Sequence, residues 1–138
     1  MSLTAIAADF RPASGVGAMI RLDLPRPRSV NELYANVRGK GRVKTKVYRQ
    51  WRNEAGWMIA AQGRPAQLHG KYQIQIAVKR WSARADIGNF EKGVSDVLQE
   101  HDVIEDDRFC ERICIYWDDH LPKGVECRVW IWPEEASS

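Results

Sequence analysis

The sequence predicts a two-layer α+β domain, in which a mixed β-sheet carries its helices packed on one face. Four segments alternate apolar with polar residues, as half-buried strands do. Two segments between them repeat apolar residues at helical spacing, which gives the order strand, helix, strand, helix, strand, strand. With 138 residues, of which 44% are hydrophobic, the chain can build one core. We expect a flexible leader over 1–17, a single domain over 18–133 and a C-terminal tail over 134–138.

The first half of the predicted domain contains a strand, a long loop and a helix. Alternation over residues 20–24 indicates the strand, which Pro25 ends. A loop of about 18 residues follows, a length that is typical of functional loops in small domains. Thr45 then stands where a helix N-cap is expected, and the helix should run to about Ala61. Its apolar stripe is predicted to consist of Val47, Trp51, Ala55 and Met58.

The second half contributes three strands and a short helix. A strand is expected from Tyr72 to about Trp81, a helix over about 88–100, and strands over 109–117 and 125–132. Alternation in the third strand places Cys110 and Cys114 on one face. In the last strand, Trp130 and Trp132 share a face with Arg128, where they could stack on bases or pack across a dimer interface.

Composition excludes several classes of protein. No apolar run approaches the roughly 18 residues of a membrane span, and the start of the chain does not resemble a secretory signal. Three cysteines, Cys110, Cys114 and Cys127, match neither a disulfide framework nor a zinc site, so we expect reduced, buried thiols. These features favour a cytoplasmic protein with no membrane association and no small-molecule cofactor.

The net charge of +3 conceals a strong segregation of charge. Residues 1–84 carry 16 Lys and Arg against 4 Asp and Glu, whereas residues 85–138 carry 5 against 14. A basic ladder recurs at every second residue, which in an extended segment would place five cations on one side. The ladder consists of Arg38, Lys40, Arg42, Lys44 and Lys46, and the following helix continues it with Arg49 and Arg52. This pattern suits a nucleic-acid backbone, although a flexible basic loop would show it too.

The acids of the second half gather around the shorter helix. Asp86 and Asn89 stand near its start, Lys92 and Asp96 lie four residues apart on it, and Asp106 with Asp107 follows it. Two such carboxylates could hold Mg²⁺, and the lysine could neutralise charge on a cleaved phosphodiester. The alternative is structural: a helix cap, an ordinary surface ion pair and a solvated acidic loop.

The stretch Asp86-Ile-Gly-Asn-Phe-Glu-Lys92, followed by Asp96 and then by Glu105-Asp-Asp107, resembles the RusA family of Holliday junction resolvases. That family has the pattern Asp-x-Asp-Asn-x-x-Lys, an Asp on the following helix and an Asp-Asp pair before the next strand. Leu24-Pro25, with Ser29 and Asn31 after it, is similar to the family's Pro-Ser-x-Asn segment. The resemblance implies a homodimeric, Mg²⁺-dependent endonuclease of four-way or branched DNA, of a kind frequent in phages and prophages.

The resemblance implies a role for each matching residue. Asp86 and Asp107 would be metal ligands and Lys92 the catalytic lysine. Asp106 would be an acidic neighbour that could also bind the metal. Asn89 and Asp96 take supporting places. Gly88 departs from the family, because it replaces the second aspartate. Either Asp106 or Asn89 fills the gap, or activity is weaker, or the protein binds junctions without cutting them. We expect retained activity, since Asp86, Lys92 and Asp107 are all present.

Overall fold

The computed structural model describes residues 19–134, so the predicted leader and all but Glu134 of the predicted tail lie outside the described residues. It contains the predicted strands and helices, but a hairpin before the first helix changes the predicted order, and three short 3-10 turns are added. The elements are β1 (Ile20–Leu24), η1 (Val30–Glu32), β2 (Tyr34–Val37), β3 (Gly41–Lys44), α2 (Lys46–Ala61), β4 (Tyr72–Val78), η2 (Ile87–Phe90), α3 (Glu91–Glu100), η3 (Asp107–Phe109), β5 (Cys110–Trp117) and β6 (Cys127–Pro133).

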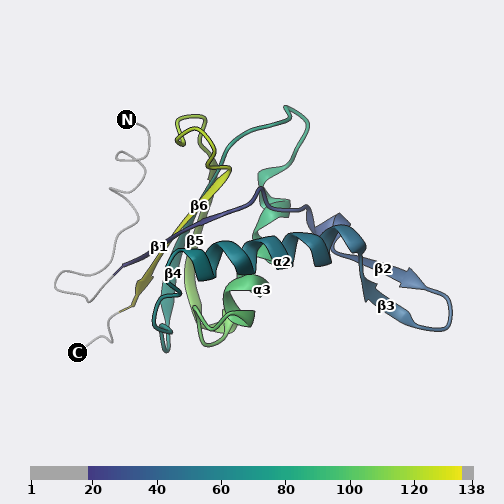
Figure 1. The fold of residues 1–138 in the computed structure, drawn as a ribbon, viewed down its shortest axis with the longest axis horizontal. Helices are drawn as coiled ribbons and strands as arrows, with labels where there is room; N and C mark the ends of the chain where they lie inside the picture. The colour runs from purple at the N-terminus through teal and green to yellow at the C-terminus, as the bar shows by residue number, and fades with distance from the viewer. Residues whose placement is uncertain (1–18, 135–138) are drawn as a thin grey trace.

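The main sheet has the strand order β1-β6-β4-β5. Strand β4 pairs parallel with β5, and the other two pairings are antiparallel, so the sheet is mixed as predicted. Both helices lie beside this sheet (Figure 1), and the main core fills the space between the two layers. Ile74, Ile76 and Val129 from the sheet meet Ile59 and Leu98 from the helices there. The two-layer α+β prediction is therefore confirmed.

Helix α2 begins where the sequence indicates, because the side chain of Thr45 accepts a hydrogen bond from the Tyr48 amide at 3.1 Å. The predicted stripe was wrong at its ends: Val47 is exposed, and Met58 is only half-buried. The buried apolar side chains are instead Tyr48, Trp51, Ala55 and Ile59. Among the helices of residues 19–134, none combines the length and apolar character that a membrane span requires.

The predicted single loop before α2 contains a β-hairpin. Strands β2 and β3 pair antiparallel, and residues 38–40 form the turn between them. Gly39 and Gly41 have φ of 82° and 73°, values that glycine adopts without strain. The basic ladder is therefore not one extended segment, since Arg38 and Lys40 occupy the turn and Arg42 lies on β3. The hairpin projects away from the two layers (Figure 1).

A register shift separates the predicted pair of cysteines on β5. Tyr72 of β4 is opposite Cys110, whereas Gln73 is opposite Arg112, so one residue of β5 bulges out. Cys110 therefore packs against the main core, and Cys114 packs against a small cluster on the other face. The prediction that they share a face was wrong, because alternation fails at a bulge. All three thiols are free, but only Cys127 is fully buried, and Cys110 and Cys114 are half-buried.

The small cluster on the other sheet face contains Trp130 and Trp132, which are 8% and 6% exposed. Leu121 and Ala77 pack with them. Of the two alternatives for Trp130 and Trp132, stacking on bases is therefore wrong, since little of either indole is accessible. Arg128, on the same face, pairs with Asp23 of the neighbouring strand through two hydrogen bonds of 2.7 and 3.1 Å.

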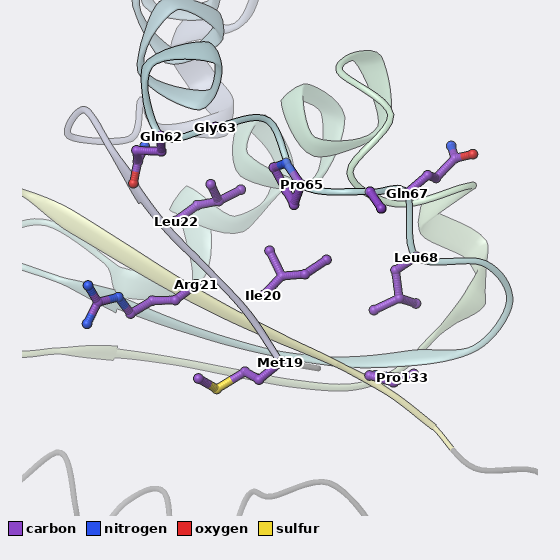
Figure 2. A pocket seen from close by; sticks show the side chains of 11 residues that line it. Met19, Ile20, Arg21, Leu22, Gln62, Gly63, Pro65, Gln67, Leu68 and Pro133 are labelled. Carbon is purple, nitrogen blue, oxygen red and sulfur yellow. The ribbon is translucent and has the colours of Figure 1, made fainter. Parts of the chain in front are cut away.

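A hollow beside β1 lies between that strand and the segment that follows α2 (Figure 2). Ile20, Leu22, Pro65 and Leu68 line much of it, so its wall is largely apolar. None of the acidic or basic residues singled out by the sequence borders it. The predicted site residues therefore lie outside this hollow.

Candidate functional site

The crossover that joins β4 to β5 carries every predicted acid and the predicted lysine. Parallel neighbouring strands need such a connection, and here it consists of residues 79–109 with η2, α3 and η3. Strand β4 ends at Val78, earlier than the predicted end near Trp81, so residues 79–85 separate it from Asp86. Asp107 does stand where the sequence places it, just before β5.

Lys92 lies between two carboxylates. Its Nζ is 3.0 Å from Oδ1 of Asp96 and 3.7 Å from Oδ2 of Asp107. The hydrogen bond to Asp96 raises the pKa of Lys92 above its ordinary value, and burial opposes this shift only in part. Half of the lysine side chain stays exposed, so a protonated ammonium group is held in place and remains accessible.

Aromatic side chains connect this lysine to the basic hairpin. The hydroxyl of Tyr48, on α2, donates to Oδ2 of Asp96 at 3.1 Å. The ring of Tyr48 packs edge-on against that of Tyr34 on β2, with centroids 5.8 Å apart. The guanidinium of Arg42 lies 4.4 Å from the centroid of Tyr34. The hairpin and the lysine are thus linked by one continuous series of contacts.

Two hollows meet at Lys92 and Asp107. One has a volume of about 440 Å³, and Tyr34 and Lys44 of the hairpin border it together with Tyr48 and Asp96. The other, of about 480 Å³, is bordered by Glu91, Ser95 and the first residues of β5. Because the two share Lys92 and Asp107, a polyanion could pass across both residues.

Asp107 is positioned by its backbone, since its amide donates to Oε1 of Gln99 at 2.9 Å. Its carboxylate is about one third exposed. Glu91 borders the same hollow and accepts a hydrogen bond from the hydroxyl of Ser95. Burial raises the pKa of the Tyr72 phenol, and the charges of Cys110, Asp107 and Glu91 raise it further. Glu91 and Asp107 thus border one hollow, and Tyr72 lies opposite Cys110, which borders it too.

Sequence reasoning missed both Glu91 and Tyr72. Glu91 stands next to Lys92 in the motif, but adjacent helical residues point in different directions, and spacing alone gives no reason to choose it. Tyr72 follows the alternation of a core strand and gives no separate signal.

Asp86 caps η2, and its Oδ1 accepts a hydrogen bond from the Gly88 amide at 3.2 Å. The side chain of Asp86 is exposed and borders neither hollow. Asn89 is half-buried, and its amide donates to the backbone carbonyl of Asp86. A Cβ atom at Gly88 would meet only Oδ1 of Asp86, at 3.7 Å, and φ is not positive there. Backbone conformation therefore does not require glycine at this position.

Asp106 has a structural partner already. Its side chain caps η3 by accepting from the Arg108 amide at 2.9 Å, and it faces the guanidinium of Arg108 at 3.5 Å. Over residues 19–134, no three side chains of the His, Cys, Asp or Glu type gather closely enough to form a metal cluster. Asp107 and Glu91 do offer hard oxygen donors at one hollow, and Mg²⁺ needs only one or two protein carboxylates. The donor set is thus compatible with Mg²⁺.

The predicted DNA-binding cations fall into two groups. Arg52 is engaged, because it forms two hydrogen bonds with Glu100 and lies 5.4 Å from the Tyr48 ring centroid. Arg49 donates to the Lys44 carbonyl at 2.6 Å, which fastens the hairpin to α2. The remaining cations have no carboxylate within ion-pair distance among the described residues. They are Arg38, Lys40, Arg42, Lys44 and Lys46, all exposed.

Comparison with known proteins yields one family. The family model described as "Endodeoxyribonuclease RusA" matches residues 25–130, which is most of the chain. No curated protein matches the sequence. The matched segment begins directly after β1 and includes the hairpin, both helices and the whole crossover.

Proposed function

Because the chain belongs to the RusA family of endodeoxyribonucleases, we propose that it resolves four-way DNA junctions as a Mg²⁺-dependent, structure-selective endonuclease. The observation that carries this proposal is Lys92, held between Asp96 and Asp107 where two hollows meet. The exposed cations of the hairpin border one of these hollows and offer contacts to phosphates.

Each group of the site has a chemical role in this proposal. The raised pKa of Lys92 keeps it protonated, so it donates to a phosphate oxygen and stabilises the charge that develops during cleavage. Asp107 and Glu91 would hold the metal ion, which supplies Lewis-acid activation. Asp96 and Tyr48 orient the lysine. Asp86, exposed at the start of η2, is available as a further ligand.

The second candidate is a protein that binds branched DNA without cutting it. Two observations favour it: Gly88 replaces a family carboxylate, and no cluster of three metal ligands exists among residues 19–134. In this case the acids of the crossover only stabilise the fold, and the hairpin provides the binding activity.

Incubation with a synthetic four-way junction separates the two candidates. We expect nicks with Mg²⁺ and none with EDTA, and Asp107→Asn should lower the cleavage rate by about 100-fold or more while preserving junction binding. Asp119→Asn is the matched control, because Asp119 is exposed in the turn before β6. Tight binding with no product in Mg²⁺ would select the non-catalytic candidate.

The metal ligands are resolved by comparing Glu91→Gln with Asp86→Asn. If Glu91 completes the site with Asp107, its variant should need more Mg²⁺ for half-maximal cleavage than the Asp86 variant does. The opposite order would assign Asp86 as the second ligand. Gly88→Asp tests the departure from the family, and it should lower the Mg²⁺ requirement, since space and backbone conformation permit the substitution.

A homodimer fits this function, because a four-way junction presents two equivalent strands to a two-fold symmetric partner. Strand β5 lies at an edge of the main sheet, and Ile113 on it is 44% exposed. This edge is the interface that we propose. Sedimentation velocity of Ile113→Asp, compared with the unaltered protein, tests whether it supports a dimer.

A further inference from the structure

A fourth hollow, of about 320 Å³, lies between the second half of α2 and the end of α3. Trp57 forms one wall and exposes 77% of its surface, the most of any large hydrophobic residue that the structure describes. A single exposed apolar side chain is common in proteins, but this indole also borders a hollow that contains a second aromatic ring and an arginine.

The floor of this hollow depends on a close approach between two helices. The imidazole of His101, just after α3, lies directly over Gly56 of α2. A Cβ atom at Gly56 would come within 2.7 Å of the ring atoms Cε1 and Nε2, so only glycine admits the imidazole there. The hollow thus has an aromatic wall, Trp57, and an aromatic floor, His101.

The polar groups at the rim are mainly donors. Asn53 and Arg64 border the hollow, and Arg64 has no carboxylate within ion-pair distance among the described residues. Glu100 also borders it, but Arg52 forms hydrogen bonds with both of its oxygens. Because Arg52 and Glu100 neutralise each other, the remaining charge at the rim is that of Arg64 and is positive. This charge disfavours a metal cation or a basic peptide as the occupant and favours a polyanion.

The hollow continues the path of the proposed site. Arg52 and Glu100 border both this hollow and the one that contains Lys92 and Asp96. Trp57 lies five residues beyond Arg52 on α2, which is about 7.5 Å along the helix axis. That distance is close to two stacked base steps of about 3.4 Å each. A strand that passes Lys92 would therefore reach Trp57 within a few nucleotides.

We propose that Trp57, with His101 and Arg64, forms a stacking site for an unpaired base of the DNA strand that leaves the Lys92 site. This inference rests on the proposed function and adds to it a contact specific for single-stranded DNA. An aromatic ring beside a basic path is the general means of binding unpaired bases, because every base presents a π-face. Trp57 is not expected to take part in cleavage, since it borders neither hollow at Lys92.

The test uses the full chain in EDTA, with three fluorescent DNAs: single-stranded oligothymidylate, a duplex of equal length, and a four-way junction with 2-aminopurine at the branch point. Trp57→Ala should weaken oligothymidylate binding by roughly 5-fold to 100-fold, the range for loss of one base stack. Trp57→Phe should retain most of the affinity, and duplex binding should not change. Val47→Ala is the control, because Val47 is another exposed apolar side chain on α2.

Stacking should also quench 2-aminopurine in the unaltered protein and not in Trp57→Ala. Equal single-strand affinity of Trp57→Ala and Val47→Ala would overturn the stacking site while leaving the nuclease proposal intact. Dissociation of a dimer by Trp57→Ala in the absence of DNA would overturn it too, and would assign the surface to a second copy of the chain. Failure of the unaltered protein to bind any of the three DNAs would instead overturn the proposed function itself.

Discussion

In the crossover between β4 and β5, charged side chains contact one another, whereas in the hairpin of β2 and β3 the cations extend into solvent. Lys92 has carboxylates at 3.0 and 3.7 Å, and Asp106 pairs with Arg108. Arg38, Lys40 and Lys44 lie on an exposed hairpin with no carboxylate near them in the described part of the chain. The charged groups of the crossover therefore already have partners in the folded chain, while under the proposed function these hairpin cations gain carboxylate-like partners, the phosphates, only on DNA binding.

This difference predicts that substitutions in the two regions separate binding from chemistry. The largest effect should come from replacing Arg38, Lys40, Arg42 and Lys44 together by Ala. Removal of four phosphate contacts should reduce the salt slope of log K by roughly 3 to 4 and weaken junction binding on the order of a thousand-fold at 0.1 M salt. Binding measured across a salt series checks this.

The melting temperature of the same fourfold variant should stay close to that of the unaltered protein, because these cations have little to lose within the folded chain. A large drop in melting temperature would show that the hairpin is not a free binding surface. An unchanged salt slope would show that the DNA contacts lie elsewhere.

The next effect in size concerns chemistry. Lys92→Ala should lower the cleavage rate at saturating protein by about 100-fold to 1,000-fold, because it removes a preorganised donor to the phosphate. Junction affinity should change far less than in the fourfold hairpin variant. Single-turnover rates, combined with binding measured in EDTA, separate the two quantities. Loss of affinity equal to the loss of rate would make Lys92 a binding residue only.

A smaller effect should follow from Tyr48→Phe, which deletes one hydroxyl and keeps the ring that packs against Tyr34. Loss of one hydrogen bond to Asp96 should reduce the cleavage rate by roughly 2-fold to 10-fold, with little change in affinity. Phe90→Leu serves as a control for packing near the crossover, since Phe90 is buried against Trp81 and Trp117. Equal rate loss in both variants would indicate a general packing effect.

The smallest effect concerns the free energy of unfolding and a residue that contacts both the hairpin and α2. Thr45 caps α2 and its hydroxyl also donates to the Glu32 carbonyl at the base of the hairpin. Thr45→Ala should lower the free energy of unfolding by about 1 kcal/mol, whereas Thr45→Ser should restore most of it. Urea denaturation of the three proteins checks this, and equal stability of the Ala and Ser variants would contradict it.

The parts of the fold that the sequence predicted are those with at least one buried face. Alternation located β1, β4, β5 and β6, and the cap at Thr45 located the start of α2. The hairpin escaped prediction because both of its faces are largely exposed, so it has no apolar alternation to reveal it. Gly39 and Gly41 were the available signal for its turn. The stripe of α2 was misread because Tyr48 and Ile59, rather than Val47 and Met58, pack into the main core.

The sequence could predict those parts of the candidate site whose residues are close together in the chain. Lys92 and Asp96 are one helical turn apart, and the structure places them together as the spacing requires. Contact between Lys92 and Asp107 depends on how the crossover docks, and only the resemblance to a family indicated it. Tyr72 comes near the site through the pairing of β4 with β5, and Glu91 borders the same hollow as the first residues of β5 because of how α3 packs, which no spacing along the chain reveals. The metal ligands themselves stay a prediction.

The parallel pairing of β4 with β5 also has a consequence for how the protein folds. The hairpin and α2 are made by contacts between residues close in sequence, whereas β5 can join β4 only after the whole of the crossover has closed. Closing so long a connection carries an entropic cost that local contacts avoid, which slows its formation. Asp107 stands at the start of β5 and reaches Lys92 only when that strand has docked. During refolding, the circular dichroism signal of the helices should therefore return before the contact between Lys92 and Asp107 forms. A chain trapped before β5 docks would bind DNA but could not yet cleave it.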